Sequence, residues 1–344
     1  MSVVKTVLLK EALETLQLPE LKRNLFSSPE WLVVLQKTYD LKLFVMYVER
    51  EGRISSYIVY SVVKNFLEWK ICVCSYCDYF DGHIEDPRDW QLFFEELRAQ
   101  YPHYRIAVRN LRDETVRGNQ NFKVLSKERF HILDVRPDLD RLWKGTHDSF
   151  RSPVKQATKA GVVVKRCGKD GLRKFYGLHL KLRKNKYRLF PQPYRFFDII
   201  WRDYVDQGQG VLLGAFDKDG RFIGGTVFLI CGNTLYYKFN TSDRDCLKLR
   251  PNNILMWEGI KFAKERNLEF LDMGSSGYEQ TGLVMFKDHT GARRLDITHL
   301  GFAPPDYKFS QKRILKVMTR TFTLPWMPNF MLKLGSHLIY PYLA

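Results

Sequence analysis

The segment 234–276, TLYYKFNTSDRDCLKLRPNNILMWEGIKFAKERNLEFLDMGSS, changes its hydrophobic pattern twice and decides the fold. Its first residues, LYYKFN, favour a strand, and LEFLDMG near its end favours another. Between them Pro251 suits the first position of a helix. The apolar residues that follow form a broad stripe at helical spacing, namely Ile254, Trp257, Ile260 and Phe262. The segment therefore predicts strand, helix and strand in succession, which is typical of a mixed α/β domain.

The same kind of pattern extends on both sides of this segment. Before it, 210–230 predicts two strands around the hairpin turn DKDG. After it, 281–289 predicts a short helix and 293–302 a strand. The first half of the chain repeats the pattern, with predicted helices at 28–39 and 87–101 and predicted strands at 42–49, 54–63, 70–77 and 104–110. We therefore predict a duplicated domain, with one copy over 1–135, the second over 136–310 and a tail over 311–344.

Composition limits the partners and the location. The chain has 344 residues, a formal charge of +17 and 45% hydrophobic residues. This content suffices for two cores at the usual domain size of about 100–200 residues. Such an excess of cations indicates an anionic partner: nucleic acid, a phosphate-bearing substrate or an acidic membrane surface. MSVVKTVLLKEALETLQLPELK does not resemble a signal peptide, and no run approaches the roughly 18 apolar residues of a spanning helix. The expected location is the cytoplasm.

Six cysteines fit free thiols in that compartment. The cluster CVCSYC at 72–77 has no second Cys/His pair at ligand spacing, which favours buried thiols over a zinc site. We predict no metal site.

The segment 151–171, RSPVKQATKAGVVVKRCGKDG, predicts a short cationic helix followed by a strand. Ser152 suits the N-cap and Gly161 the left-handed position after the helix. Three cations recur every four residues and share one face of the helix: Arg151, Lys155 and Lys159. This row is either a solvated helix face or a binding site for phosphates or nucleic acid.

Four segments in this order resemble the Fem-type aminoacyltransferases that build peptidoglycan cross-bridges, and their CelD-like relatives in the GNAT superfamily. They are HDSFRSPVKQATKAGVVV (147–164), GAFDKDGRFIGGTVFL (214–229), the segment 234–276 and GLVMFKDHTGA (282–292). The resemblance covers roughly 25–305 and is strongest over 145–300. It implies an α/β fold of two tandem GNAT-like domains, mostly antiparallel sheets flanked by helices, with the second domain catalytic. The coiled-coil arm of Fem enzymes has no counterpart here, so the resemblance implies the fold more strongly than the peptidoglycan-bridge role.

The resemblance also implies where the chemistry takes place. A GNAT fold attacks an activated acyl group with an amine where two strands splay apart, here LYYKFN and LEFLDMG. The amine must lose a proton and the tetrahedral oxyanion must be stabilised. By resemblance, Lys287 matches a lysine used near the transferred acyl group; its alternative is a solvent-facing helix lysine. Asp272, at the carboxyl end of a strand, and His289, beside Lys287 in sequence, are the other catalytic candidates, although Asp272 also fits a loop-capping role.

The segment 181–197, KLRKNKYRLFPQPYRFF, interleaves cations with aromatic residues. Cations neutralise phosphates while aromatic rings stack on bases or sugars. In the family the corresponding segment lies over the acceptor cleft, so the resemblance implies a lid over an anionic acceptor. The substrate-binding candidates here are Arg183, Lys186 and Arg188, and Tyr237 is a further one that also fits a core position. His179, in an apolar helix, favours a structural role.

The donor is inferred from a missing motif. Common acyl-CoA enzymes of this fold carry a glycine-rich pyrophosphate loop before a helix, and YKFNTSDRDCLKLRPNN contains none. We therefore expect an acyltransferase that forms an amide between an aminoacyl group from aminoacyl-tRNA and an amine on a cell-envelope precursor, a peptidoglycan peptide or amino sugar. Two alternatives remain: an acyl-CoA or acyl-carrier-dependent N-acyltransferase of polysaccharide biosynthesis, and a non-catalytic tandem domain that binds nucleic acid or phosphate. No tightly bound cofactor is expected.

The tail at 311–344 combines cations, apolar residues and aromatic residues, and it contains no acid. Such a segment is typical of an interfacial anchor on an anionic membrane, and it would bring the enzyme to a lipid-linked acceptor. The residues expected to contact the membrane are Lys312, Arg313, Lys316, Arg320, Trp326, Phe330, Lys333 and Leu334. The alternative is an extension that packs on the protein's own surface.

Overall fold

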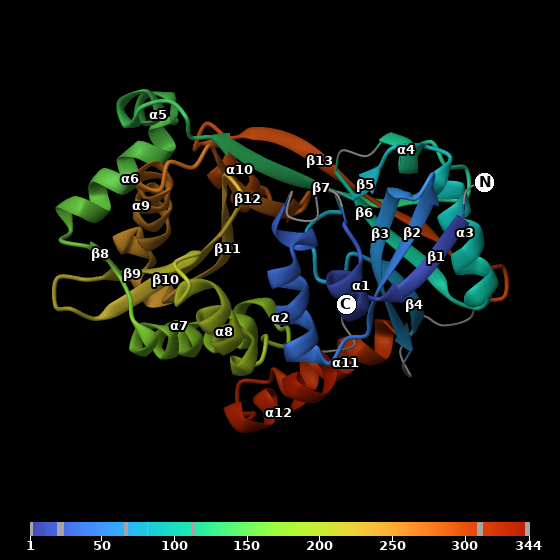
Figure 1. Ribbon diagram of the computed structural model, residues 1–344. Helices are drawn as coiled ribbons and strands as arrows, with labels where there is room; N and C mark the ends of the chain where they lie inside the picture. The colour runs from blue at the N-terminus through green and yellow to red at the C-terminus, as the bar shows by residue number, and fades with distance from the viewer. Residues whose placement is uncertain are drawn as a thin grey trace. The chain divides into compact units, whose positions relative to one another are not determined.

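The computed structural model of the protein describes residues 3–18, 24–64, 68–80, 82–111, 114–307 and 312–340. The chain forms two compact units, each built from segments that are not contiguous in sequence (Figure 1). Unit 1 contains 1–128, 296–318 and 339–344, and unit 2 contains 129–295 and 319–338. This division differs from the expected ranges 1–135, 136–310 and 311–344 because 296–310 belongs to unit 1 and the tail is shared by both units.

Unit 1 is a mixed α/β unit, as the sequence predicts. Its strands are β1 (Val3–Leu8), β2 (Leu43–Arg50), β3 (Arg53–Lys64), β4 (Trp69–Val73), β5 (His83–Ile84), β6 (Arg105–Asn110) and part of β13 (Arg293–Phe302). They lie in the order β1, β2, β3, β4, β6 and β13, with β5 beside β3. The pairs are antiparallel except for β4 with β6. The helices are α1 (Leu9–Thr15), α2 (Pro29–Tyr39), α3 (Asp89–Gln100) and α4 (Glu114–Arg117).

Local sequence explains where these elements begin and end. Ser28 caps α2 by accepting a hydrogen bond from the Trp31 amide, and Pro29 occupies the first turn. The predicted strand 70–77 is too long, because Cys74 and Tyr76 adopt φ values of 60° and 52° and end β4 at Val73. The structure adds β1, α1 and β7 (Lys123–Asp134), which the sequence patterns did not reveal.

Unit 2 repeats the α/β plan around a second set of strands. These are part of β7, β8 (Val163–Arg166), β9 (Gly210–Phe216), β10 (Phe222–Cys231), β11 (Thr234–Ser242) and β12 (Phe270–Gly277), in the order β7, β12, β11, β10, β9, β8. The helices are α5 (Leu139–Gly145), α6 (Asp148–Lys159), α7 (Lys169–Leu182), α8 (Tyr194–Ile200), α9 (Pro251–Glu265) and α10 (Thr281–Asp288). Helices α7 and α8 continue into π-helical turns at Arg183–Tyr187 and Trp201–Val205.

Helices cover both faces of the unit 2 strands (Figure 1). Buried residues of α6 and α9 share one core with Leu213 of β9. Helix α7 lies on the other face, where the closely packed Gly171 approaches Leu212. Neighbouring residues of a strand point to opposite faces of the sheet. Leu213 of β9 therefore packs against α6 and α9, and Leu212 packs against α7.

Helix α6 corrects one sequence expectation. It begins at Asp148, and the side chain of His147, not Ser152, caps it by accepting a hydrogen bond from the Ser149 amide at 3.1 Å. Pro153 therefore lies inside the helix instead of at its first position. The end of the helix is as predicted, since Gly161 adopts a φ of 77° just after it.

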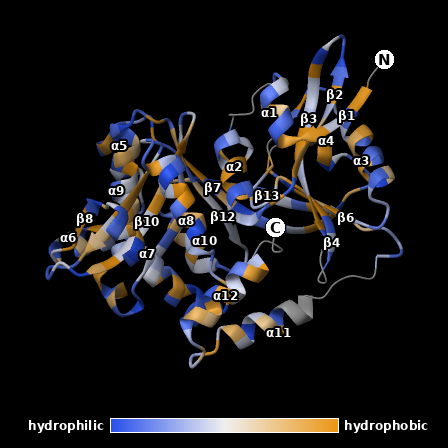
Figure 2. Ribbon diagram, turned by 60° about the horizontal axis from the view of Figure 1, so that its bottom comes forward, coloured by the Kyte–Doolittle hydropathy of each residue, from blue (hydrophilic) through white to orange (hydrophobic). Residues whose placement is uncertain are grey.

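The tail forms α11 (Lys312–Phe322) and α12 (Asn329–Ile339). Both helices carry hydrophilic and hydrophobic residues along their length (Figure 2). The alternative of a self-packed extension is confirmed for one side of α12, since Leu332 and Ser336 are completely buried. Of the residues expected to contact a membrane, the side chains of Lys312 and Arg313 lie outside the described part of the structure.

Candidate active site

Strands β11 and β12 separate in the middle of unit 2. They pair in parallel at three positions, of which Tyr236 opposite Asp272 is the last. Strand β11 continues to Ser242 and β12 to Gly277 without further pairing between their described residues. This is the splayed pair that the sequence resemblance implies.

A bulge next to this point accounts for the separation. On β10, Phe228 opposes Tyr237 and the preceding residue, Val227, opposes Phe239. Lys238 is thus an extra residue on β11, and such a residue bends its strand and breaks the alternation of side chains. Accordingly Tyr237 packs against Phe228 at a ring distance of 5.7 Å, whereas Phe239 packs against Phe197 of α8 at 5.1 Å.

Lys287 of α10 reaches the part of β12 that lies beyond its pairing with β11. Its Nζ donates hydrogen bonds to the carbonyl oxygens of Gly274 and Ser275, both at 3.0 Å. Only 2% of the residue is exposed, so the alternative of a solvent-facing lysine is wrong. A buried ammonium group just beyond the point where the strands separate can interact strongly with a nearby negative charge.

Asp272 lies in the same part of β12. Its side chain is 1% exposed, and Oδ1 accepts a hydrogen bond from the Gly274 amide at 2.7 Å. Gly274 adopts a φ of 68°, a conformation that favours glycine. Asp272 therefore fixes the backbone of β12 at Gly274, whose carbonyl group holds Lys287. This contact is structural, like the loop-capping alternative that the sequence left open, but it lies within a strand.

A buried histidine beside Lys287 was missed by the sequence analysis. His131 of β7 has a completely buried side chain, and its Nε2 lies 3.0 Å from Oδ1 of Asp288, the residue after Lys287. Burial lowers the pKa of His131, and the charge of Lys287 acts in the same direction. The neutral imidazole is therefore favoured. The segment RFHILD did not predict this pair, because Asp288 is distant from His131 in sequence.

His289 directly follows α10, two residues after Lys287, and contacts the start of α6. Its ring stacks on His147 with centroids 4.6 Å apart, and its carbonyl oxygen accepts a hydrogen bond from the His147 amide at 2.9 Å. The structure thus joins His289 to the start of α6. Arg151, one turn further along α6, donates to the carbonyl oxygens of Trp143 at 3.2 Å and Lys144 at 3.0 Å, and also to that of Thr146.

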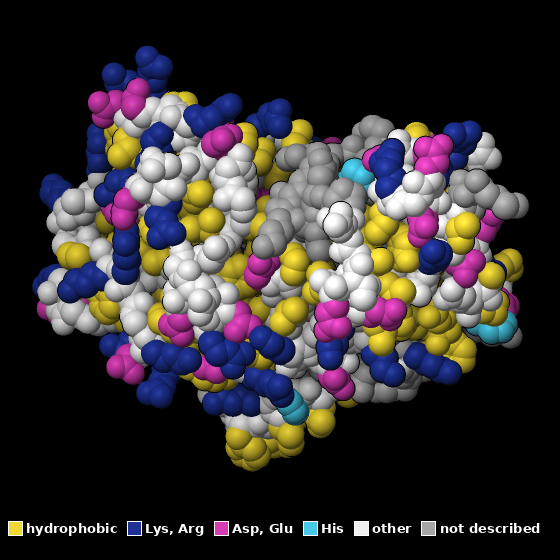
Figure 3. Space-filling model, in the orientation of Figure 1, with side chains coloured by type: hydrophobic (Ala, Val, Ile, Leu, Met, Phe, Trp, Pro, Cys, Tyr) yellow, Lys and Arg dark blue, Asp and Glu magenta, His cyan; other side chains and the backbone are white. Residues whose placement is uncertain are grey.

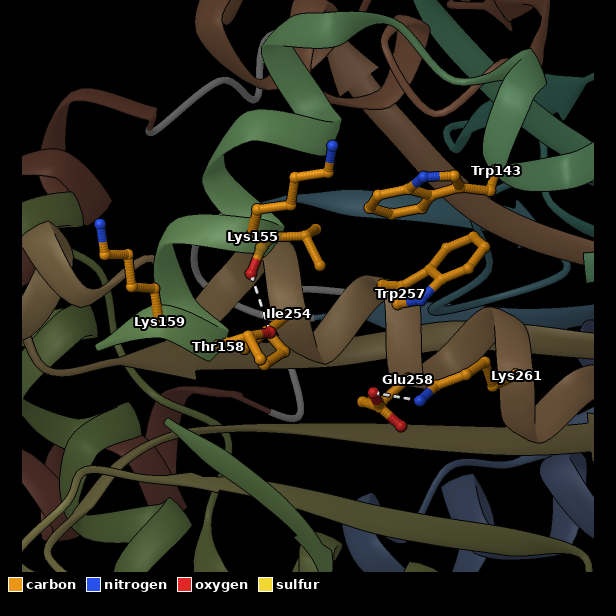
Figure 4. A pocket seen from close by; sticks show the side chains of 9 residues that line it. Trp143, Lys155, Thr158, Lys159, Ile254, Trp257, Glu258 and Lys261 are labelled. Atoms are coloured by element: carbon orange, nitrogen blue, oxygen red, sulfur yellow. Dashed lines mark hydrogen bonds and ion pairs between the residues drawn. The ribbon is translucent and has the colours of Figure 1, made fainter. Parts of the chain in front are cut away.

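Lys155 and Lys159, unlike Arg151, line a pocket of 540 Å³ between α6 and α9 (Figure 4). The rings of Trp143 and Trp257 lie side by side in it, with centroids 4.6 Å apart. Lys261 also lines the pocket, where it pairs with Glu258 at 2.5 Å. Spacing predicted the row of cations, but the tryptophans were not recognised as part of a site because Trp257 reads as an ordinary member of an apolar stripe.

The expected acceptor-binding cations near 181–188 mostly contact the protein itself. Arg183 donates to the Phe190 carbonyl oxygen through Nε at 3.1 Å and Nη2 at 2.7 Å, and Arg188 donates to that of Thr323. Lys186 is exposed and lies over the Tyr187 ring at 5.1 Å. These residues belong to the layer of α7, across the sheet from α6 and its lysines.

Tyr237 is half-buried, and burial raises the pKa of its hydroxyl group. It lies on β11 next to the splay point and is the only one of the substrate-binding candidates that the described structure places there. Among the described residues no group of three or more histidine, cysteine or acidic side chains is arranged to hold a metal ion.

One comparison with known protein families concerns the middle of unit 2. Residues 144–281 match the family described as acetyltransferase (GNAT) domain. A search of curated protein sequences finds no match. The match includes the splayed strands and α9 and ends before Lys287, and its description supports an acyltransferase.

Similar solved structures have the same fold over most of the chain. FemX aligns with a TM-score of 0.61 and 13% identity over 85% of this chain and 94% of its own. A tandem GNAT protein from the clavulanic acid biosynthesis pathway aligns with a TM-score of 0.57 and 11% identity over 89% of this chain and 100% of its own. L-PGS from Bacillus licheniformis aligns with a TM-score of 0.53 and 12% identity over 89% of this chain and 95% of its own. The expected fold class, tandem GNAT-like α/β domains, is confirmed.

Proposed function

We propose that this acyltransferase, whose GNAT domain matches over 144–281, forms an amide bond between an aminoacyl group and an amine on an anionic cell-envelope precursor. The observation that carries the proposal is the buried ammonium group of Lys287 beside the splayed strands. The similarity of the fold to FemX supports transfer of an aminoacyl group over other acyl groups.

The reaction joins the acceptor nitrogen to the carbonyl carbon of the donor. The nitrogen attacks this carbon and loses a proton, and negative charge develops on the carbonyl oxygen. Lys287 stabilises that charge. The bond from the carbon to the leaving oxygen of the donor then breaks, and a proton returns to that oxygen. Asp272 positions the part of β12 that holds Lys287. His131 of β7 contacts Asp288, the residue after Lys287, and so holds the end of α10.

The donor that we propose is aminoacyl-tRNA, with the peptide or amino sugar of the precursor as acceptor. The absence of a pyrophosphate loop before α9 supports this choice, because a CoA diphosphate is usually held by backbone N–H groups there. The second candidate for the donor is acyl-CoA, because the name of the similar tandem GNAT protein refers to AcCoA. With a lipid-linked acceptor, we propose that the protein works in the cytoplasm at the inner face of the membrane.

A transfer assay with separate donors tests this function. The purified full chain is incubated with radiolabelled aminoacyl-tRNA or acyl-CoA and an amine-bearing envelope precursor, and the amide product is counted. Product from aminoacyl-tRNA alone supports the proposal, product from acyl-CoA alone overturns the donor, and no product from either favours the non-catalytic alternative.

The pocket between α6 and α9 supplies a prediction about anion binding. We propose that Lys155 and Lys159 bind phosphates of the acceptor. Changing both to alanine is expected to weaken acceptor binding about tenfold, in line with the loss of a charge-assisted hydrogen bond. The melting temperature should hardly change because both side chains are exposed. Titration calorimetry at two salt concentrations measures the affinity.

Two further variants separate this binding from effects on folding. Lys174→Ala with Lys218→Ala removes two exposed cations elsewhere in unit 2 and should leave acceptor affinity unchanged. Arg151→Ala should lower the melting temperature, because its guanidinium group holds the carbonyl groups at the end of α5. Equal affinities in the Lys155/Lys159 variant and the wild type would show that this row is a solvated helix face.

A further inference from the structure

Helix α12 and the turn before it expose large apolar side chains on one side. Trp326 is 72% exposed, Phe330 69%, Leu334 56% and Leu338 58%. Because Phe330, Leu334 and Leu338 are spaced by four residues, they lie on one face of the helix. These four residues are called the α12 patch. A contiguous apolar surface of this kind is typical of an interaction site, since isolated exposed apolar residues are common but clusters are not.

The opposite side of α12 is firmly attached to unit 2. Leu332 is completely buried, and the Ser336 hydroxyl donates a hydrogen bond to the carbonyl oxygen of Pro191. Gly335 is so close to Phe190 that a β-carbon would lie 2.9 Å from the ring. The α12 patch therefore belongs to a folded surface, and its exposure does not come from a detached tail.

The basic segment after α7 holds the turn between α11 and α12. The buried ammonium group of Lys184 donates to the carbonyl oxygens of Pro325 at 3.1 Å and Met327 at 2.7 Å. Arg188 donates to that of Thr323. Two cations of the segment 181–197, including the acceptor-binding candidate Arg188, thus hold the turn that contains Trp326 and leads into α12.

The charged residues of the tail itself are all cations. Arg320, Lys333 and His337 are exposed, and the sequence from 312 to 340 contains no aspartate or glutamate. In Figure 3 the hydrophobic side chains at the lower edge of the molecule lie next to Lys and Arg side chains. An apolar face with cations beside it complements the headgroup region of an anionic bilayer, in which apolar side chains enter the acyl boundary and cations meet phosphates.

We propose that the α12 patch docks the protein on the surface of an anionic phospholipid bilayer, with α12 lying in the plane of the interface. None of the helices in the described part of the chain is long and apolar enough to cross a membrane. A second copy of the chain is a poorer occupant, because a symmetric contact through this face would bring Lys333 close to its counterpart, and the tail itself offers no acid to neutralise the two cations. Docking does not depend on the transfer chemistry.

Co-sedimentation with vesicles tests the proposal on the full chain. Vesicles of phosphatidylglycerol and phosphatidylcholine are compared with vesicles of phosphatidylcholine alone, using the wild type and the double variant Phe330→Ser with Leu334→Ser. The wild type is expected to bind the anionic vesicles, and the variant at least tenfold more weakly, because burial of two large apolar side chains is lost. Lys333→Gln should weaken binding about fivefold, and added salt should reduce this difference.

Two controls make the result decisive. Val163→Ser with Leu247→Ser changes exposed apolar residues away from the α12 patch and should leave vesicle binding unchanged. Equal melting temperatures of the two double variants exclude unfolding, since all four side chains are more than 40% exposed. If the wild type does not co-sediment with anionic vesicles, the proposal is overturned. So does a concentration-dependent dimer, measured by sedimentation velocity, that the patch variant alone abolishes while vesicle binding persists.

Discussion

Lys287→Ala is expected to lower the turnover number about a hundredfold, which is the usual loss when one group that stabilises an oxyanion is removed. The buried ammonium group lies at the carbonyl oxygens of Gly274 and Ser275, next to the point where β11 and β12 separate. A negative charge that develops there gains more from a desolvated cation than from water. Turnover in the assay with the active donor measures the loss, and KM should change much less.

The prediction requires that a change in folding be separated from a change in chemistry. Loss of the lysine removes its hydrogen bonds to one buried and one partly buried carbonyl group, and it costs about 1–3 kcal/mol of stability. Lys287→Met fills more of the space while removing the charge and should be as inactive as the alanine variant. Lys218→Ala, in the exposed hairpin between β9 and β10, should retain full turnover. Full activity in folded Lys287→Met would show that Lys287 only stabilises β12 and takes no part in the reaction.

The sequence predicted the elements around the site because their patterns are local. Pro251 and the apolar stripe of α9 agree with the observed helix, and the hairpin turn between β9 and β10 lies where DKDG predicts it. The lysine in α10 was found through its resemblance to a family motif. The burial of Lys287 could not be predicted, since it depends on contacts with the backbone of β12.

The errors come from contacts between residues distant in sequence. Arg151 has helical spacing with Lys155 and Lys159, yet its guanidinium group turns back to carbonyl groups of α5. The pairing of His131 with Asp288 joins β7 to α10 across more than 150 residues. The cations near 184–188 looked like ligands for phosphate, but two of them hold carbonyl groups of the tail. Spacing shows which residues share a face, but it does not show what that face contacts.

His179 is expected to make the protein less stable as the pH falls below neutrality. It is 5% exposed, packs between Phe175 and Phe197, and lies 2.9 Å from the Gln192 amide oxygen. Burial lowers the pKa of His179 from 6.5 to about 3, with a smaller effect from Arg183. The unfolded chain therefore binds a proton at a higher pH than the folded chain. Stability from the neutral ring is complete above about pH 6.5 and is lost progressively as the pH falls toward 3.

Urea unfolding at several pH values, for the wild type and His179→Gln, measures this loss. A shift of this size corresponds to about 1.4 kcal/mol per pH unit inside the window, so the wild type should lose about 2 kcal/mol from this group between about pH 7.5 and 5. The glutamine variant cannot titrate, so its deficit in unfolding free energy relative to the wild type should shrink by that amount over the same range.

His103→Gln provides the control, because 63% of the His103 side chain is exposed. Its unfolding free energy should not converge with that of the wild type in this way. If the unfolding free energy of the wild type and of His179→Gln falls in parallel, the prediction is wrong. The folded protein would then accept the proton at His179 as readily as the unfolded chain does. The aromatic packing around α7 would have to open below pH 6.5 to allow this.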